Sequence, residues 1–136
     1  MTLAPANRRL LIATAMAMAL MWLLGFLANL LAGAGAMVAG PADSYTNPLS
    51  LLVTAVAMAA GGWIAGKRFI GVALGFMCLL WIAIVFVLFR ISAPVQADAL
   101  SRILAFNGLQ MFLSTLAACA GAAIGAWLQM RRTAKA

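Results

Sequence analysis

The side chains that could do chemistry in this sequence are few, and the most polar of them fall inside long apolar stretches. They are the amides and hydroxyl of Asn29, Asn107, Gln110 and Ser114. An amide in hydrocarbon is unfavourable unless it finds a hydrogen-bond partner, so these groups should face the interior of a helix bundle or an aqueous edge. Two interpretations follow. The four residues line a small polar vestibule that opens outward and holds a ligand, lipid headgroup or ion, or they form hydrogen bonds between helices, which is the favoured interpretation.

Other reactive residue types do not form a recognisable centre. The chain has no histidine, two acidic residues and two cysteines, Cys78 and Cys119, which lack a Cys-x-x-Cys spacing. Methionine sulfur is a ligand for Cu(I), but the methionines are scattered along the chain with no histidine to accompany them. No nucleophile–base pair, carboxylate pair or phosphate-binding loop is present in the sequence. We therefore predict that the protein is not an enzyme and has no catalytic residues, metal site or cofactor.

Helices must position these side chains, because four stretches without a charged residue occupy nearly all of the 136-residue chain. The stretches cover residues 10–33, 48–66, 69–89 and 103–130. A helix needs about 20 apolar residues to cross a bilayer core of roughly 30 Å. The sequence therefore predicts an all-α integral membrane protein, in which residues 1–136 form a single domain of four spanning helices packed as a bundle.

The composition excludes an ordinary soluble domain. Hydrophobic residues make up 67% of the chain, charged residues 8%, and the mean hydropathy is +1.11. Nine basic and two acidic residues are too few to cover a soluble core of this size. The net charge of +7 would suggest nucleic acid as a partner of a soluble protein, but here the basic residues flank the apolar stretches. We therefore predict membrane lipids as partners and no nucleic acid.

The distribution of basic residues predicts the orientation. Seven of them flank the spans on one side of the membrane: Arg8, Arg9, Lys67, Arg68, Arg131, Arg132 and Lys135. Arg90 and Arg102 lie on the other side, together with both acidic residues. Lysine and arginine near the ends of spans are retained in the cytoplasm. We therefore predict a bacterial inner-membrane protein with both termini in the cytoplasm.

The N-terminal segment has a second interpretation. A basic start, an apolar stretch and the small residues at 34–36 together are similar to a secretory signal peptide with its cleavage site. The apolar stretch is, however, much longer than the 7–15 residues or so that are typical of such a peptide. An uncleaved first span is therefore favoured.

Small residues predict where the helices meet, because lipid tails are as apolar as leucine and helices associate where small side chains let backbones approach. Five pairs have the i, i+4 spacing: Gly62 and Gly66, Gly71 and Gly75, Gly121 and Gly125, Ala13 and Ala17, and Ala55 and Ala59. The glycine pairs lie towards the cytoplasmic halves of their spans. We therefore expect tight packing at that end, within one chain or between protomers.

The connections between spans are short. The first outer loop, residues 34–47, ends in Asn47-Pro48, which predicts a helix start capped by the asparagine. The link around Lys67 and Arg68 is so short that it predicts an antiparallel hairpin of the second and third spans.

Residues 61–68, GGWIAGKR, resemble the Gly-Gly-x-x-Ala-Gly-Arg segment of many uncharacterised small bacterial four-span proteins. This resemblance implies the architecture and no activity, because those families have none assigned. We expect a structural or interaction subunit that packs with itself, as a homo-oligomer, or with a membrane partner. The alternative is a minimal oligomeric transporter or channel for a small solute or ion, with Asn29, Asn107 and Gln110 lining its outer mouth.

Overall fold

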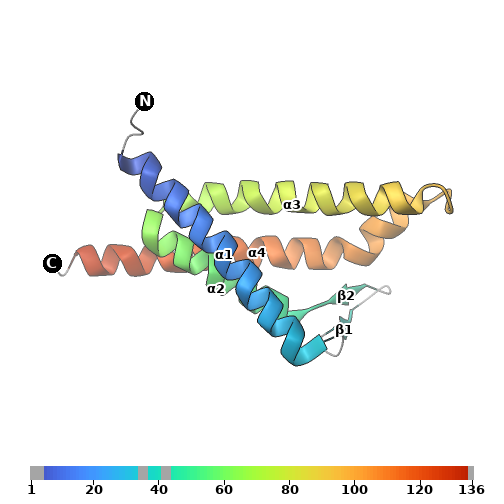
Figure 1. The fold of residues 1–136 in the computed structure, drawn as a ribbon, viewed down its shortest axis with the longest axis horizontal. Coiled ribbons are helices and arrows are strands. Elements are labelled where there is room, and N and C mark those ends of the chain that lie inside the picture. Colours follow the sequence, from blue (N-terminus) through green and yellow to red (C-terminus); the bar gives the residue numbers. More distant parts are fainter. Residues whose placement is uncertain (1–4, 34–36, 41–43, 135–136) are drawn as a thin grey trace.

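The computed structural model describes residues 5–33, 37–40 and 44–134. Its helices are α1 (Pro5–Ala32), α2 (Pro48–Ala65), α3 (Arg68–Ser92) and α4 (Ala99–Thr133) (Figure 1). All four are long and apolar enough to cross a membrane, so the predicted four-helix, all-α architecture is confirmed. α4 has 35 residues. At 1.5 Å per residue it is about 52 Å long, so its ends extend past an apolar core of roughly 30 Å.

A small β-hairpin joins α1 to α2, where the sequence predicted only a loop. β1 (Val38–Ala39) pairs antiparallel with β2 (Tyr45–Thr46). Valine, tyrosine and threonine favour extended backbone, which accounts for the two short strands. The Tyr45 ring packs on Phe106 of α4, with ring centroids 5.1 Å apart. The possible cleavage site at 34–36 lies outside the described residues.

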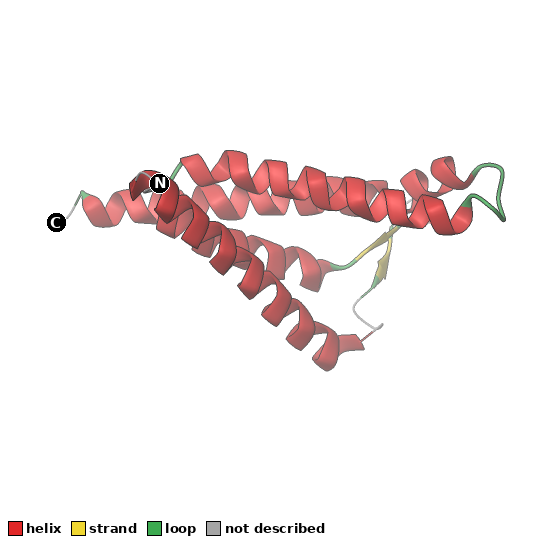
Figure 2. Cartoon of the chain, turned by 45° about the horizontal axis from the view of Figure 1, so that its top comes forward, coloured by secondary structure: helices red, strands yellow, loops and turns green. Residues whose placement is uncertain are grey.

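The four helices lie close together at one end of the molecule (Figures 1 and 2). We call the end where α1 begins and α4 finishes the terminal end. The opposite end, where the β1–β2 hairpin lies, is the hairpin end. α2 lies along α4 in parallel, α3 lies along α4 in the opposite direction, and α1 packs mainly on α2. Towards the hairpin end α1 leans away from α3 and α4 (Figures 1 and 2).

The hairpin predicted for α2 and α3 is correct in direction but not in packing. The link is short: Gly66 ends α2 with a φ of +71°, and α3 begins two residues later. Most of α3 nevertheless packs on α4 and touches α2 only to a small extent. One contact between these two connected helices is made by the ring of Phe69, which lies over Gly61 where a side chain would otherwise stand.

The apolar core lies towards the terminal end. Its buried residues are Ala13, Ala17, Met58, Phe69, Ala73, Met77, Ala118 and Ala122. Phe69, Met58 and Met77 are the largest fully buried side chains, and five of the other members are alanines. Small side chains allow the helices to approach closely here, whereas most large apolar side chains of α1 and α3 point outward.

The described basic residues lie in two groups, one at each end of the molecule. At the terminal end the exposed members are Arg8, Arg9, Lys67, Arg68, Arg131 and Arg132. Arg90 and Arg102 are exposed at the hairpin end. The Arg131 guanidinium lies 3.8 Å from the centroid of the Trp127 ring, an aromatic–cation pair suited to a membrane interface. Lys135 lies outside the described residues.

Candidate functional site

A polar junction at the hairpin end ties the start of α2 to the middle of α4. The Asn47 side chain caps α2, because its Oδ1 accepts a hydrogen bond of 3.0 Å from the amide of Ser50, and Pro48 follows at the first helical position. This confirms the predicted helix start. Gln110 of α4 completes the junction. Its Oε1 accepts a hydrogen bond from the backbone N–H of Asn47 at 3.0 Å, and its Nε2 donates to Ser50 Oγ at 2.9 Å.

The four predicted polar residues do not form one cluster. Gln110 bonds to α2, whereas Asn107 donates to the carbonyl of Ile103 within its own helix at 3.0 Å. Ser114 is hydrogen-bonded to a residue of α3, and Asn29 lies exposed on α1. The reason is the arrangement of helices: α4 lies between α2 and α3, so polar groups one turn apart on α4 serve different neighbours.

Ser114 meets a partner that the sequence interpretation missed. The indole Nε1 of Trp81 on α3 donates to Ser114 Oγ at 2.9 Å, and that hydroxyl donates to the Met111 carbonyl at 3.1 Å. The signal for this pair was present in the sequence. A tryptophan N–H in the middle of an uncharged span requires an acceptor, and hydroxyls on neighbouring spans can supply one.

The Trp81–Ser114 bond should couple α3 to α4 energetically. We expect a double-mutant cycle with Trp81→Phe and Ser114→Ala to give a coupling energy of roughly 1 kcal/mol, within the range measured for hydrogen bonds between membrane helices. The free energy of unfolding is measured by denaturing-detergent titration in mixed micelles. Additive effects of the two substitutions would show that the bond contributes nothing.

The closest helix contact joins α2 and α4 through backbone atoms. A Cβ added at Gly121 would overlap the carbonyl oxygen of Ala55, and one at Gly125 would overlap that of Ala59. From the other side, a Cβ at Gly62 would overlap the carbonyl oxygen of Ala122.

The remaining paired glycines differ from these three. Gly66 faces the amide of the Gln129 side chain. Gly71 and Gly75, on α3, are exposed, and nothing lies within 4 Å of the position of a Cβ at either. Within the described residues the predicted packing role of this pair therefore has no counterpart inside the chain.

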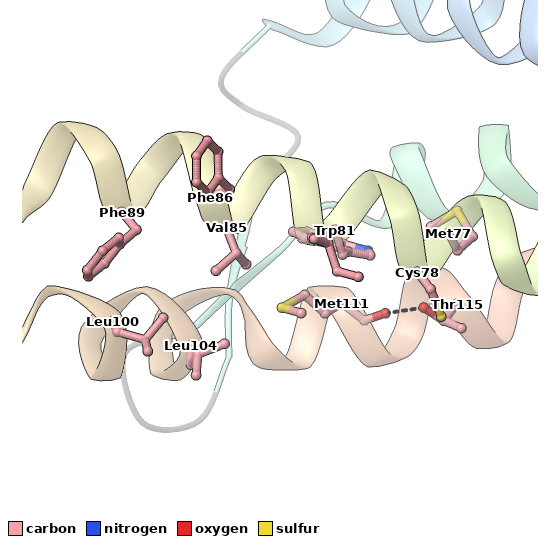
Figure 3. Close-up of a pocket in the computed structure, with 11 residues that line it drawn as sticks. Met77, Cys78, Trp81, Val85, Phe86, Phe89, Leu100, Leu104, Met111 and Thr115 are labelled. Carbon is pink, nitrogen blue, oxygen red and sulfur yellow. Dashed lines mark hydrogen bonds between the residues drawn. The ribbon is translucent and has the colours of Figure 1, made fainter.

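A hollow of about 580 Å³ lies between α3 and α4 (Figure 3). Its walls are apolar apart from the thiol of Cys78, the indole N–H of Trp81 and the hydroxyl of Thr115. The Trp81 N–H is bonded to Ser114, and the Thr115 hydroxyl donates to the Met111 carbonyl at 2.8 Å. With its N–H and O–H donors already used, this groove offers little to orient a polar ligand.

A second hollow, of about 340 Å³, lies between α1 and α2 at the hairpin end. It is the more polar of the two, because Asn29, Asn47, Ser50 and Thr54 line it. We call it the polar crevice. Of the four predicted polar residues, Asn29 is the one that lines it. On the α2 side, the sequence predicted Asn47 only as a helix cap.

The fold and these sites define a class: a protein of four helices that are each long and apolar enough to be embedded in a membrane. Within that class the comparisons give no particular relative. No protein-family model matches the chain, and no curated protein or solved structure does.

Proposed function

We propose that this chain is a bacterial inner-membrane protein with both termini in the cytoplasm, and that it is a non-catalytic structural or interaction subunit. It packs against a second copy of itself through α3. The segregation of basic residues between the two ends supports the orientation. The resemblance of residues 61–68 to small bacterial four-span proteins supports the location.

The observation that carries this proposal is the open glycine face of α3. Gly62, Gly121 and Gly125 are each closed by the backbone of a neighbouring helix, whereas Gly71 and Gly75 meet nothing. Only 11% of the most apolar part of α3 is buried, against 33% for α4. Van der Waals packing at small residues drives helix association in lipid. An exposed glycine pair therefore favours close packing of another helix against it.

Cys78 provides a direct test, because it is exposed and lies three residues after Gly75 on the same face of α3. In native membranes of a Cys119→Ala background, mild oxidation is expected to convert most of the protein into a Cys78–Cys78 dimer. A disulfide requires Cα atoms within about 7 Å, so its formation reports close approach of two α3 helices. The dimer is measured by non-reducing electrophoresis.

Two controls separate a specific contact from random collision. Moving the cysteine five positions, in Cys78→Ala with Ala83→Cys, turns it about 140° around the helix to another exposed position away from the glycine face, and should remove the dimer. Gly71→Leu with Gly75→Leu should do the same, whereas Gly108→Leu, at another open glycine, should not. Equal dimer yields from positions 78 and 83, or none from 78, would contradict the proposal.

The alternative, a minimal oligomeric transporter or channel, is supported by the polar crevice. Asn29 lines this crevice, but Gln110 is bonded to α2 and Asn107 to its own helix. Under this alternative, transport begins at the polar crevice. Solute flux in proteoliposomes tests it, because a structural subunit produces none.

A further inference from the structure

The polar crevice is unusual in a chain this apolar, and its hydrogen-bonding groups are unevenly used. Three acceptors around it already have donors. Asn47 Oδ1 accepts from the Ser50 amide at 3.0 Å, Ser50 Oγ accepts from Gln110 at 2.9 Å, and the Ser50 carbonyl accepts from Thr54 Oγ1 at 2.8 Å. The acceptor atoms of the α2 wall are thus largely occupied.

The donors of the same crevice are not occupied. Among the described residues, nothing accepts a hydrogen bond from the side-chain NH₂ of Asn29 or of Asn47, and the Ser50 hydroxyl proton has no acceptor. Each amide carries two N–H donors. These donor groups come from both walls of the crevice: the Asn29 amide from α1, and the Asn47 amide and the Ser50 hydroxyl from the start of α2 and its cap. No acidic side chain is among the described lining residues.

We propose that the polar crevice binds a phosphate oxyanion, either on a phospholipid headgroup or free in solution. Phosphate presents acceptor oxygens on several sides, which matches a wall of unfilled donors, and hydrogen bonds to a charged acceptor are the stronger kind. A hollow of about 340 Å³ is at the small end of ligand sites and suits a headgroup or a small anion.

The surroundings of the crevice also fit a lipid. Gly25 and Gly33 on its α1 wall have nothing within 4 Å of a Cβ position, so the wall is open beside Asn29. Trp22 and Phe26 precede Asn29 by seven and three residues, so they share its side of α1, and they are 77% and 66% exposed. They form an apolar track along which acyl chains would lie when the headgroup is in the crevice.

The test uses the full-length protein purified in a phosphorus-free detergent. Retained phospholipid is counted by native mass spectrometry, and binding is followed through tryptophan fluorescence as short-chain phosphatidylglycerol or inorganic phosphate is added. Asn29→Leu is expected to weaken binding roughly tenfold, because it removes a donor to a charged group. Asn29→Asp, which places a negative charge in the crevice without changing its size, is expected to weaken binding further.

Asn107→Leu is the matched control, because it removes an amide that lies outside the crevice and bonds within α4. Loss of retained phospholipid in both Asn29 variants but not in this control supports the proposal with a lipid as the source. A response to inorganic phosphate that the Asn29 variants lose supports it with the free anion. No binding of either probe by the wild-type protein, or equal loss in Asn29→Leu and Asn107→Leu, would overturn it.

Discussion

Replacing Gly125 by alanine is expected to lower the free energy of unfolding by about 2–3 kcal/mol, and replacement by leucine by more. The added Cβ would overlap the carbonyl oxygen of Ala59 and would stand 2.8 Å from the backbone nitrogen of Trp63. Backbone atoms cannot swing aside as the end of a side chain can, so α2 and α4 must separate. Unfolding in mixed micelles measures the loss.

Gly108→Ala is the matched control, because nothing lies within 4 Å of the position of its Cβ. Alanine is the better helix former by about 1 kcal/mol, so this substitution should be neutral or stabilising. The two changes have the same chemistry on the same helix and opposite expected signs. If Gly125→Ala also proved neutral, the close α2–α4 contact would be wrong.

Gln110→Leu is expected to destabilise the protein by about 2 kcal/mol, because it removes two hydrogen bonds between helices, each worth roughly 0.6–2 kcal/mol in a membrane. The backbone N–H of Asn47 and the Ser50 hydroxyl oxygen both lose their partner on α4. The start of α2 is then held to α4 by apolar contacts alone. Hydrogen exchange at the first turn of α2 should increase along with the loss of overall stability.

Asn107→Leu should change stability by less than about 0.5 kcal/mol, since its amide bonds only to the Ile103 carbonyl one turn earlier. The sequence gives no reason to separate the two amides, which are three residues apart on one span. An equal effect of the two substitutions would contradict the junction between Gln110 and the start of α2.

Features with a local physical cause could be predicted from the sequence. The spans follow from the absence of charge over residues 10–33, 48–66, 69–89 and 103–130, and α1 to α4 lie close to these ranges. The start of α2 follows from Asn47-Pro48, whose cap and fixed φ act within one helical turn. The separation of basic residues between the two ends follows from their order along the chain.

The partners of individual side chains could not be predicted. Gln110 and Ser114 lie one turn apart on α4, yet one bonds to α2 and the other to α3. Gly71 and Gly75 have the same spacing as Gly121 and Gly125, but nothing in the chain closes them. A periodic pattern tells which residues share a face of a helix, and it does not tell which helix lies against that face.

The sequence by itself therefore determined four apolar helices, their approximate ends and the sparse polar groups within them, because hydropathy and helix capping depend on near neighbours in the chain. The tertiary structure alone decided that α2 pairs with α4 through backbone contacts at Gly62, Gly121 and Gly125. It also decided that α1 diverges from α3 and α4 (Figure 2), and that polar side chains of α1 and the start of α2 line one crevice. These outcomes depend on which helices can approach most closely, and that follows from the fit of whole helix surfaces in three dimensions.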